Sequence, residues 1–320
     1  MDIAPTWPSR VRGCLLGGAL GDALGRPLEG APAVTPAQVD RSWNAASLRW
    51  TDDTALMVAL AEHLATAASH HDLDLDELAV AYAREWAAQP QRGYGAGPPR
   101  VFETVLRGGD WRAVAGGAFA GSGSKGNGAA MRAAPCGVVD GTPTRRAAMA
   151  TAAASVTHTH PDGTDGAVVI AAATRACLTH PLGTALDLDD FLTTCLSEVS
   201  SPTMQAAVAR VPDTLKVSDP SVVARHTGNG ILAAEAVPAA LSAFLHHADD
   251  PVRVLWFAVS MGGDTDTIAT MAGCLAGALH GQTGFPERSV ARLEQRDRIL
   301  AVADLLASRT GGASGGGGDW

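Results

Sequence analysis

The apolar part of this chain consists mainly of small and unbranched residues, which restricts the fold more than any other feature. Hydrophobic residues make up 46% of the sequence, but aromatic residues make up only 5%. Alanine and leucine supply much of the rest, and no segment of convincing length alternates as a half-buried strand does. Because alanine and leucine favour helices, we expect an all-α fold with closely packed helices.

Helical periodicity recurs along the chain. Residues 11–24 are apolar with glycine at four positions, which suits a helix packed very close to its neighbours. Residues 54–68 repeat leucine at 56, 60 and 64, on one helical face. Acidic residues mark two further helix starts, at 74–78 and 187–192. Other helices are predicted over residues 76–86, 144–156, 166–178, 221–225, 230–246, 251–259 and 267–280.

The two ends of the chain differ from its body. We predict that residues 1–10 are flexible and that residues 311–320, GGASGGGGDW, form a disordered glycine-rich tail. No long low-complexity linker lies between these ends. The sequence therefore predicts one compact multi-helix domain over residues 11–310.

Composition excludes several classes of protein. A net charge of −9 without a basic stretch argues against a protein that holds nucleic acid by its backbone. Five cysteines without C-x-x-C spacing indicate reduced thiols rather than disulfides or a zinc site. The first residues lack a signal-peptide pattern, and the uncharged run 268–285 is too polar for a membrane span. We expect a cytoplasmic protein without a membrane or stable nucleic-acid partner.

Two aspartate clusters each precede an apolar helix. The first is Thr51-Asp52-Asp53-Thr54, and the second is the segment 262–267, GGDTDT. The simplest interpretation of each cluster alone is a helix N-cap, for which Ser, Thr and Asp are preferred.

Together the clusters favour a metal site, because an N-cap needs only one side-chain oxygen. Four carboxylates lie beside threonine hydroxyls in apolar sequence, with no Lys or Arg in either cluster. Carboxylates drawn into a core must be paired or must bind a cation. Oxygen ligands select magnesium, manganese or calcium over zinc, and the EF-hand pattern is not matched. Two carboxylate sets suggest a binuclear site, with ions roughly 3.5–4 Å apart.

Two further features have alternative interpretations. The segment 121–128, GSGSKGNG, is either a flexible surface loop or a loop whose backbone N–H groups contact phosphate. It is not a Walker A loop, because its lysine is misplaced. Among the histidines of THTHP, we expect ligand contact for His158 and a structural role for His160. Glu29, taken alone, is typical of a solvated surface residue.

With these motifs, the sequence resembles the ADP-ribosylglycohydrolases, a family that includes the dinitrogenase reductase-activating glycohydrolase. The resemblance spans about residues 11–280 and rests on five blocks in the family order: GCLLGGALGDALGRPLE, WTDDTAL, GSKGNGAAMR, THTHPDGTDGA and GGDTDTIATMAGCLAGALHG. The segments 228–231, GNGI, and 237–241, VPAAL, resemble the branch that releases ADP-ribose from serine.

The resemblance implies an all-helical fold with two Mg²⁺ ions, or Mn²⁺, at the base of a cleft. The implied metal ligands are Thr51, Asp52, Asp53, Asp264, Asp266 and Thr267. Glu29 matches a glutamate on a mobile loop that gates the site and touches the metal, and Glu29, Asp52 and Asp53 are the implied catalytic carboxylates. The implied substrate contacts are Gly123, Ser124, Gly126 and Asn127 at the pyrophosphate and distal ribose, and Phe119, His158 and Ile231 at the adenine. Lys125 departs from the serine-acting branch, which tends to carry an aromatic residue there.

The implied function is magnesium-dependent hydrolysis of the ribose C1 glycosidic bond of ADP-ribosylated substrates, of the O-linked serine type. Alternatives are hydrolysis of ADP-ribosyl-arginine or of another ADP-ribose conjugate, such as a nucleic acid or O-acetyl-ADP-ribose. A two-metal phosphohydrolase, a non-catalytic ADP-ribose-binding protein and a crystallin-like structural protein also remain open. The expected partners are ADP-ribose and an ADP-ribosylated protein or other conjugate, and we expect a monomer.

Overall fold

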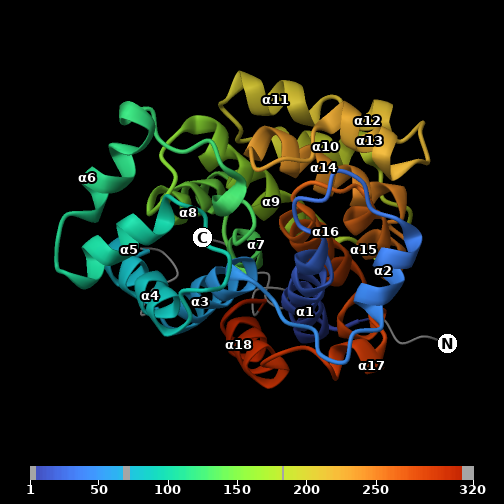
Figure 1. Cartoon of the computed structure of the whole chain (residues 1–320), viewed down its shortest axis with the longest axis horizontal. Coiled ribbons are helices and arrows are strands. Elements are labelled where there is room, and N and C mark those ends of the chain that lie inside the picture. Colours follow the sequence, from blue (N-terminus) through green and yellow to red (C-terminus); the bar gives the residue numbers. More distant parts are fainter. Residues whose placement is uncertain (1–4, 68–72, 182–183, 312–320) are drawn as a thin grey trace, which may run out of the picture.

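The computed structural model describes residues 5–67, 73–181 and 184–311, which form helices joined by loops (Figure 1). The expected all-α fold is confirmed, because the described ranges hold no strand and only two isolated bridges, Leu48 with Leu293 and Gly126 with Leu232. The helices share one hydrophobic core and form a single compact domain. Residues 1–4 and 312–320, on which most of the predicted flexible ends fall, lie outside the described residues.

The first half of the chain surrounds a long N-terminal helix. Its helices are α1 (Trp7–Gly25), η1 (Arg26–Leu28), α2 (Pro36–Trp43), α3 (Asp52–Thr66), α4 (Leu75–Ala88), α5 (Pro98–Leu106), α6 (Trp111–Gly116), η2 (Ala118–Gly121), η3 (Asn127–Ala129), α7 (Ala134–Val138) and α8 (Pro143–Ser155). Helix α1 begins before residue 11, where the domain was predicted to start.

The second half adds the remaining helices. They are α9 (Pro161–Thr179), α10 (Leu188–Leu196), α11 (Pro202–Val208), α12 (Val211–Thr214), α13 (Pro220–Thr227), α14 (Ala233–His246), α15 (Pro251–Ser260), α16 (Thr265–His280), η4 (Gln282–Gly284), α17 (Glu287–Val290) and α18 (Arg296–Arg309). Every helix predicted from periodicity is present, with shifted ends. The unpredicted helices are mostly too short to repeat an apolar face, as in α7 and α12.

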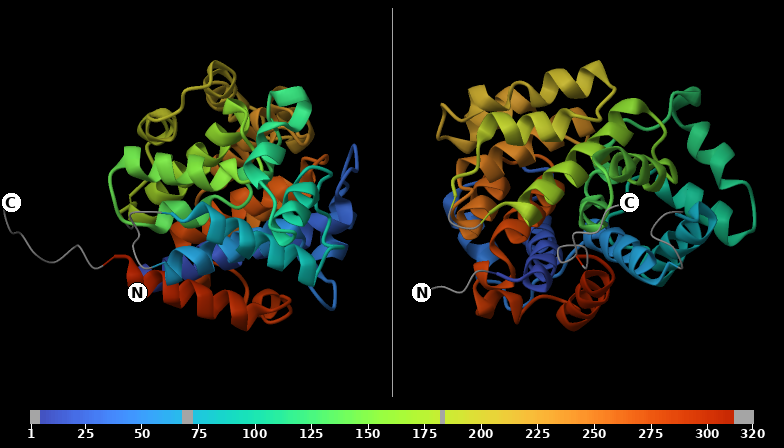
Figure 2. Two further views of the ribbon diagram at one scale, coloured as in Figure 1. Left: turned by 90° about the vertical axis from the view of Figure 1, so that its left-hand side faces the viewer. Right: turned by 180° about the vertical axis from the view of Figure 1, so that it is seen from behind.

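Helix α1 is the central element of the fold. It lies among α3, α16 and α18 (Figure 1), and the rear view shows the same arrangement (Figure 2). Its side chains are buried on all sides, as expected for a helix with neighbours all round. Glycines make the contact with α16 very close, since a Cβ at Gly17 would collide with the carbonyl of Gly273. Gly13 faces Gly277 and Gly21 faces Ala269, so the two helices run antiparallel.

We predict that Gly273→Ala destabilises the protein by about 2–3 kcal/mol, because the added methyl group must push α1 and α16 apart. Urea unfolding followed by circular dichroism measures this change. Gly95→Ala is the matched control, since no atom lies within 4 Å of a Cβ added there. Equal stability of the two variants would contradict the close contact between the helices.

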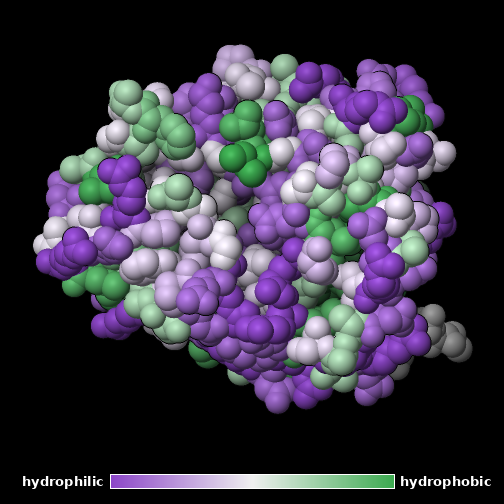
Figure 3. All heavy atoms as spheres, in the orientation of Figure 1, coloured by the Kyte–Doolittle hydropathy of each residue, from purple (hydrophilic) through white to green (hydrophobic). Residues whose placement is uncertain are grey.

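No helix in the described part of the chain is long and apolar enough to span a membrane. The face toward the viewer in Figure 3 is mostly hydrophilic, with separate hydrophobic groups between the polar ones. Most of the uncharged run 268–285, which the sequence shows to be too polar for a membrane span, lies in α16, and nearly all residues of that helix are buried.

Candidate active site

The end of α1 and the start of α16 meet because the two helices are antiparallel. A Cβ at Gly25 would collide with the backbone of Asp266, so only glycine allows this approach. The hydroxyl of Thr265 donates to the carbonyl of Gly25 at 2.8 Å. The last turn of α1 is therefore fixed against the first turn of α16.

Glu29 reaches the second aspartate cluster because it follows α1 directly, after the single turn η1. The Gly30 N–H donates to the Gly263 carbonyl at 2.8 Å, and the Gly263 N–H donates back to the same segment at 2.9 Å. As a result, carboxylate oxygens of Glu29, Asp264 and Asp266 all lie within 4.8 Å of one another. Glu29 is exposed, whereas the two aspartates are buried.

Asp22 brings the first aspartate cluster to the same place. Its carboxylate, fully buried on α1, accepts hydrogen bonds from the Thr51 N–H at 2.9 Å, the Thr54 N–H at 3.0 Å and the Thr54 hydroxyl at 2.6 Å. Burial raises the pKa of Asp22 to about 6, although these hydrogen bonds favour the charged form. The sequence alone does not single out Asp22, because its only signal there is a lone acid within an apolar, glycine-rich helix.

The N-cap interpretation accounts for only part of the clusters. Thr51 does cap α3, accepting from the Asp53 N–H at 3.3 Å, so the carboxylates of Asp52 and Asp53 are not needed as caps. Asp264 occupies the N-cap position of α16, but its side chain makes no capping hydrogen bond. It accepts instead from the side-chain amide of Asn127, at 2.6 Å.

The clustered carboxylates lack positive partners. Every ion pair among the described residues involves other carboxylates. Burial, followed by the charge of Asp22, raises the pKa of Asp52 to about 8 and that of Asp266 to about 10. Burial and Asp266 raise the pKa of Asp53 well above its usual range, and its Oδ2 atom is buried without a hydrogen-bond partner. Such a cluster could hold a metal ion, because a bound cation would compensate these charges.

Arg92, also missed in the sequence, supports the first cluster without neutralising it. Its guanidinium pairs with Glu294 at 2.7 Å, donates to the Trp50 carbonyl at 2.7 Å and stacks on the Trp50 ring. Its own carbonyl accepts from the Asp52 N–H at 3.0 Å. The positive charge is thus directed at Glu294, while the backbone holds the start of α3 in place.

The glycine loop is attached to the body of the protein at several points. The Asn127 N–H donates to the Ile231 carbonyl at 2.9 Å, and the Ala233 N–H donates to the Lys125 carbonyl at 3.0 Å. Gly123 has φ +77°, and a Cβ there would collide with the backbone of His160. These contacts indicate that residues 121–128 form an ordered loop rather than a flexible surface loop.

His158 supports this loop from inside the protein. Its ring lies against Gly126 and Gly128, and its Nδ1 is 2.7 Å from the Thr157 hydroxyl, which accepts from Arg132 at 2.8 Å. Burial lowers the pKa of His158 to about 3, so the ring is neutral. Because the Thr157 hydroxyl can donate to Nδ1, the ring hydrogen belongs on Nε2, toward the loop.

We predict that His158 makes the stability depend on pH below neutrality. Its folded pKa of about 3 lies below the unfolded value, so the unfolded state binds more protons as pH falls from about 6.5. His158 alone contributes a loss of about 2 kcal/mol at pH 5 relative to pH 7.5, whereas the buried carboxylates with raised pKa, such as Asp22 and Asp52, act in the opposite direction in every variant. In urea unfolding, the stability of His158→Gln should therefore change differently from that of the wild type by this amount, whereas His226→Gln, at an exposed site, should behave as the wild type. Parallel pH profiles for all three proteins would contradict this role.

Comparison with known proteins agrees with this geometry. The family model described as ADP-ribosylglycohydrolase matches residues 4–315. The chain belongs to the ADP-ribosylglycohydrolase family. It is 33% identical to the ADP-ribosylhydrolase ARH3 of Mus musculus and of Homo sapiens, over 87% of this chain and 86% and 87% of theirs. A solved structure of an ADP-ribosylglycohydrolase-related protein complex matches with a TM-score of 0.71 at 26% identity, covering 95% of this chain and 98% of that one.

The protein is therefore a hydrolase of glycosidic bonds that acts on ADP-ribosylated substrates. In this ADP-ribosylglycohydrolase, two of the predicted substrate residues are strongly exposed. Phe119 in η2 and Ile231 beside the glycine loop are each 71% exposed, and Phe119 has a left-handed φ of 50°. A bulky residue rarely adopts this conformation, which is typical of a functional site.

The structure also brings together the five predicted carboxylates, Glu29, Asp52, Asp53, Asp264 and Asp266. Asn127 contacts one of them, Asp264, directly. Thr51 and Thr267 flank the carboxylates, at the first turns of α3 and α16. His160 accepts from the Asp162 N–H at 3.0 Å and caps α9, in keeping with its expected structural role.

Proposed function

We propose that the protein is a magnesium-dependent ADP-ribosylhydrolase that cleaves the bond between ribose C1 and the oxygen of a modified serine. The observation that carries this proposal is the meeting of five carboxylates, from three distant segments, beside a glycine loop and without an ion pair to any described residue. The similarity of residues 228–231 and 237–241 to the serine-acting branch supports the O-linked substrate.

The residues present fit two Mg²⁺ or Mn²⁺ ions. All available donors are oxygens, and the buried Oδ2 of Asp53, which accepts no hydrogen bond from the described residues, is suited to a cation. We assign the metal ligands to Thr51, Asp52, Asp53, Asp264, Asp266 and Thr267, with Glu29 at their edge. When bound, such ions lower the pKa of water and polarise the ribose hydroxyls.

The surrounding residues would position the substrate. Asn127 holds one oxygen of Asp264 and fixes where the other points. We place the loop of Gly123, Ser124 and Gly126 at the pyrophosphate, with neutral His158 behind it. The Gly123 N–H donates to the Ala118 carbonyl and the Gly126 N–H donates to the Ser124 hydroxyl, so these hydrogen bonds hold the loop in shape. The exposed side chains of Phe119 and Ile231 supply apolar surface for the adenine.

Proton transfer to the leaving oxygen requires a carboxyl group that can reach the substrate. Among the candidates Glu29, Asp52 and Asp53, only Glu29 is exposed. Its position at the rim favours Glu29 as the group that moves the proton, while Asp52 and Asp53 remain at the base. One chain supplies all these residues, so the proposal is compatible with a monomer. All five cysteines are buried and unpaired, which supports a reducing compartment such as the cytoplasm.

The test is to incubate the protein with peptides ADP-ribosylated on serine or on arginine, in Mg²⁺ and in EDTA, and to measure free ADP-ribose. Release from the serine peptide that EDTA abolishes is the expected result. Release from the arginine peptide alone would replace the serine assignment. If neither peptide is cleaved but ADP-ribose binds, the substrate is another conjugate or the protein only binds.

A further inference from the structure

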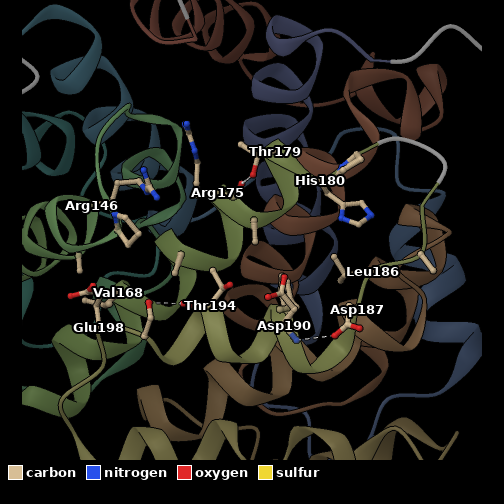
Figure 4. A pocket seen from close by; sticks show the side chains of 18 residues that line it. Arg146, Val168, Arg175, Thr179, His180, Leu186, Asp187, Asp190, Thr194 and Glu198 are labelled. Atoms are coloured by element: carbon tan, nitrogen blue, oxygen red, sulfur yellow. Dashed lines mark hydrogen bonds between the residues drawn. The ribbon is translucent and has the colours of Figure 1, made fainter. Parts of the chain in front are cut away.

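A cavity lies between α8, α9 and α10, and none of its lining residues belongs to the carboxylate cluster (Figure 4). Its volume is about 480 Å³, within the range of ligand pockets. Apolar side chains of α9 and α10 line part of it, among them Val168, Ala176 and Phe191. The cavity therefore has the size and the apolar surface to receive an aromatic side chain.

Positive charge lies along one side of this cavity. Figure 4 shows Arg146 and Arg175 together on that side, with Glu198 below Arg146 and with Asp187 and Asp190 across the cavity. Arg146 donates to the Gly141 carbonyl and forms no ion pair within residues 5–67, 73–181 and 184–311. An anionic group entering the cavity would therefore lie on the arginine side, away from the two aspartates.

The chain leaves the described fold beside the same arginines. Helix α18 ends at Arg309, and the Gly311 N–H donates to Oδ2 of Asp140 at 2.9 Å. The other oxygen of Asp140 accepts from Arg175 at 3.3 Å. Gly311 also packs against Trp7, over whose ring Arg175 lies. Asp140 thus links the cavity to the point from which residues 312–320 continue.

The sequence after Gly311 suits this cavity. It reads GASGGGGDW, so its only aromatic residue and its only charged side chain are adjacent, at Trp320 and Asp319. Nine residues reach at most about 30 Å when extended, and a flexible chain of this length spans roughly 15–18 Å. Attachment at Gly311 gives Asp319 and Trp320 a high effective concentration at the cavity, so they would bind there even if the contact is weak.

We propose that this cavity is the docking site of the chain's own C-terminal segment, with the Trp320 indole on the apolar surface and the Asp319 carboxylate at Arg146 and Arg175. The Asp319 carboxylate is complementary to the two arginines, although not to the three lining carboxylates, and the glycine spacer lets the segment turn back toward α9.

Fluorine NMR of the full chain labelled with 5-fluorotryptophan tests this proposal, with Trp320→Phe assigning the Trp320 resonance. The reference is the labelled peptide GGGGDW. We expect the Trp320 resonance to be shifted from that of the peptide, with severalfold weaker relaxation by a soluble gadolinium chelate. Ala176→Glu fills the cavity and repels Asp319. In this variant the chemical shift of Trp320 and its relaxation by the gadolinium chelate should both return to those of the peptide. The matched control is Thr193→Glu, on α10 outside the cavity lining, and it should change neither.

Arg146→Ala is the second variant and keeps the test valid if Ala176→Glu unfolds. It removes the unpaired charge at the cavity edge and should shift the Trp320 resonance toward that of the peptide. A Trp320 resonance that matches the peptide in the unaltered chain would overturn the proposal. So would a resonance that neither variant moves, or one that depends on protein concentration, since the last result places the segment on another copy.

Discussion

Asp53→Asn is expected to abolish turnover while making the metal-free protein more stable. The Asp53 carboxylate is buried, has one oxygen without a partner and faces the charges of Asp266, Asp22 and Asp52. An amide of the same shape removes that repulsion, which should stabilise the metal-free fold by about 1–2 kcal/mol. The same change removes a proposed metal ligand, so hydrolysis should fall by roughly 10²-fold or more.

Thermal unfolding in EDTA and in Mg²⁺ measures both parts of this prediction. Saturating Mg²⁺ should raise the midpoint of the wild type, by an amount worth about 2.7 kcal/mol at 100 times Kd, and should raise that of Asp53→Asn much less. Asp189→Asn, at an exposed position of α10, is the control and should match the wild type in both buffers. If Asp53→Asn is less stable than the wild type in EDTA, the result would contradict the view that uncompensated charge is concentrated at Asp53.

The sequence predicted the parts of the site that depend on local pattern. Each aspartate cluster immediately precedes an apolar helix, so its place at a helix start follows from periodicity and N-cap preference. The prediction of a bound cation followed from four carboxylates without a nearby Lys or Arg. The glycines of α1 indicated close packing, although not that α16 was the partner.

The site residues that could not be predicted from the sequence depend on contacts between distant segments. Asp22 is separated from Thr54 by two loops and a helix, and nothing in its own surroundings names its partner. Arg92 lies in a loop without periodicity, yet its carbonyl and guanidinium hold Asp52 and Trp50. The roles of Asp22 and Arg92 can be recognised only in the structure, where the antiparallel contact of α1 with α16 determines the position of the first aspartate cluster.

Asp22→Ala should destabilise the protein by about 3 kcal/mol. It leaves the Thr51 N–H, the Thr54 N–H and the Thr54 hydroxyl buried without an acceptor, and each orphaned donor costs roughly 1–3 kcal/mol. Relief of the buried charge on Asp22 offsets part of this cost. Because Asp22 positions the start of α3, Mg²⁺ affinity measured by calorimetry should also fall, by about 10–100-fold.

Asp165→Ala separates positioning from general destabilisation. Asp165 on α9 is also buried and accepts from three donors, at Ser200 and Ser201, but it contacts neither aspartate cluster. It should cost similar stability and leave Mg²⁺ affinity unchanged. A double-mutant cycle of Asp22→Asn with Thr54→Val should give a coupling energy of about 1–3 kcal/mol in Mg²⁺ binding, because the two side chains act through one hydrogen bond. Zero coupling, or an equal loss of Mg²⁺ affinity in Asp165→Ala, would reduce Asp22 to a purely structural residue.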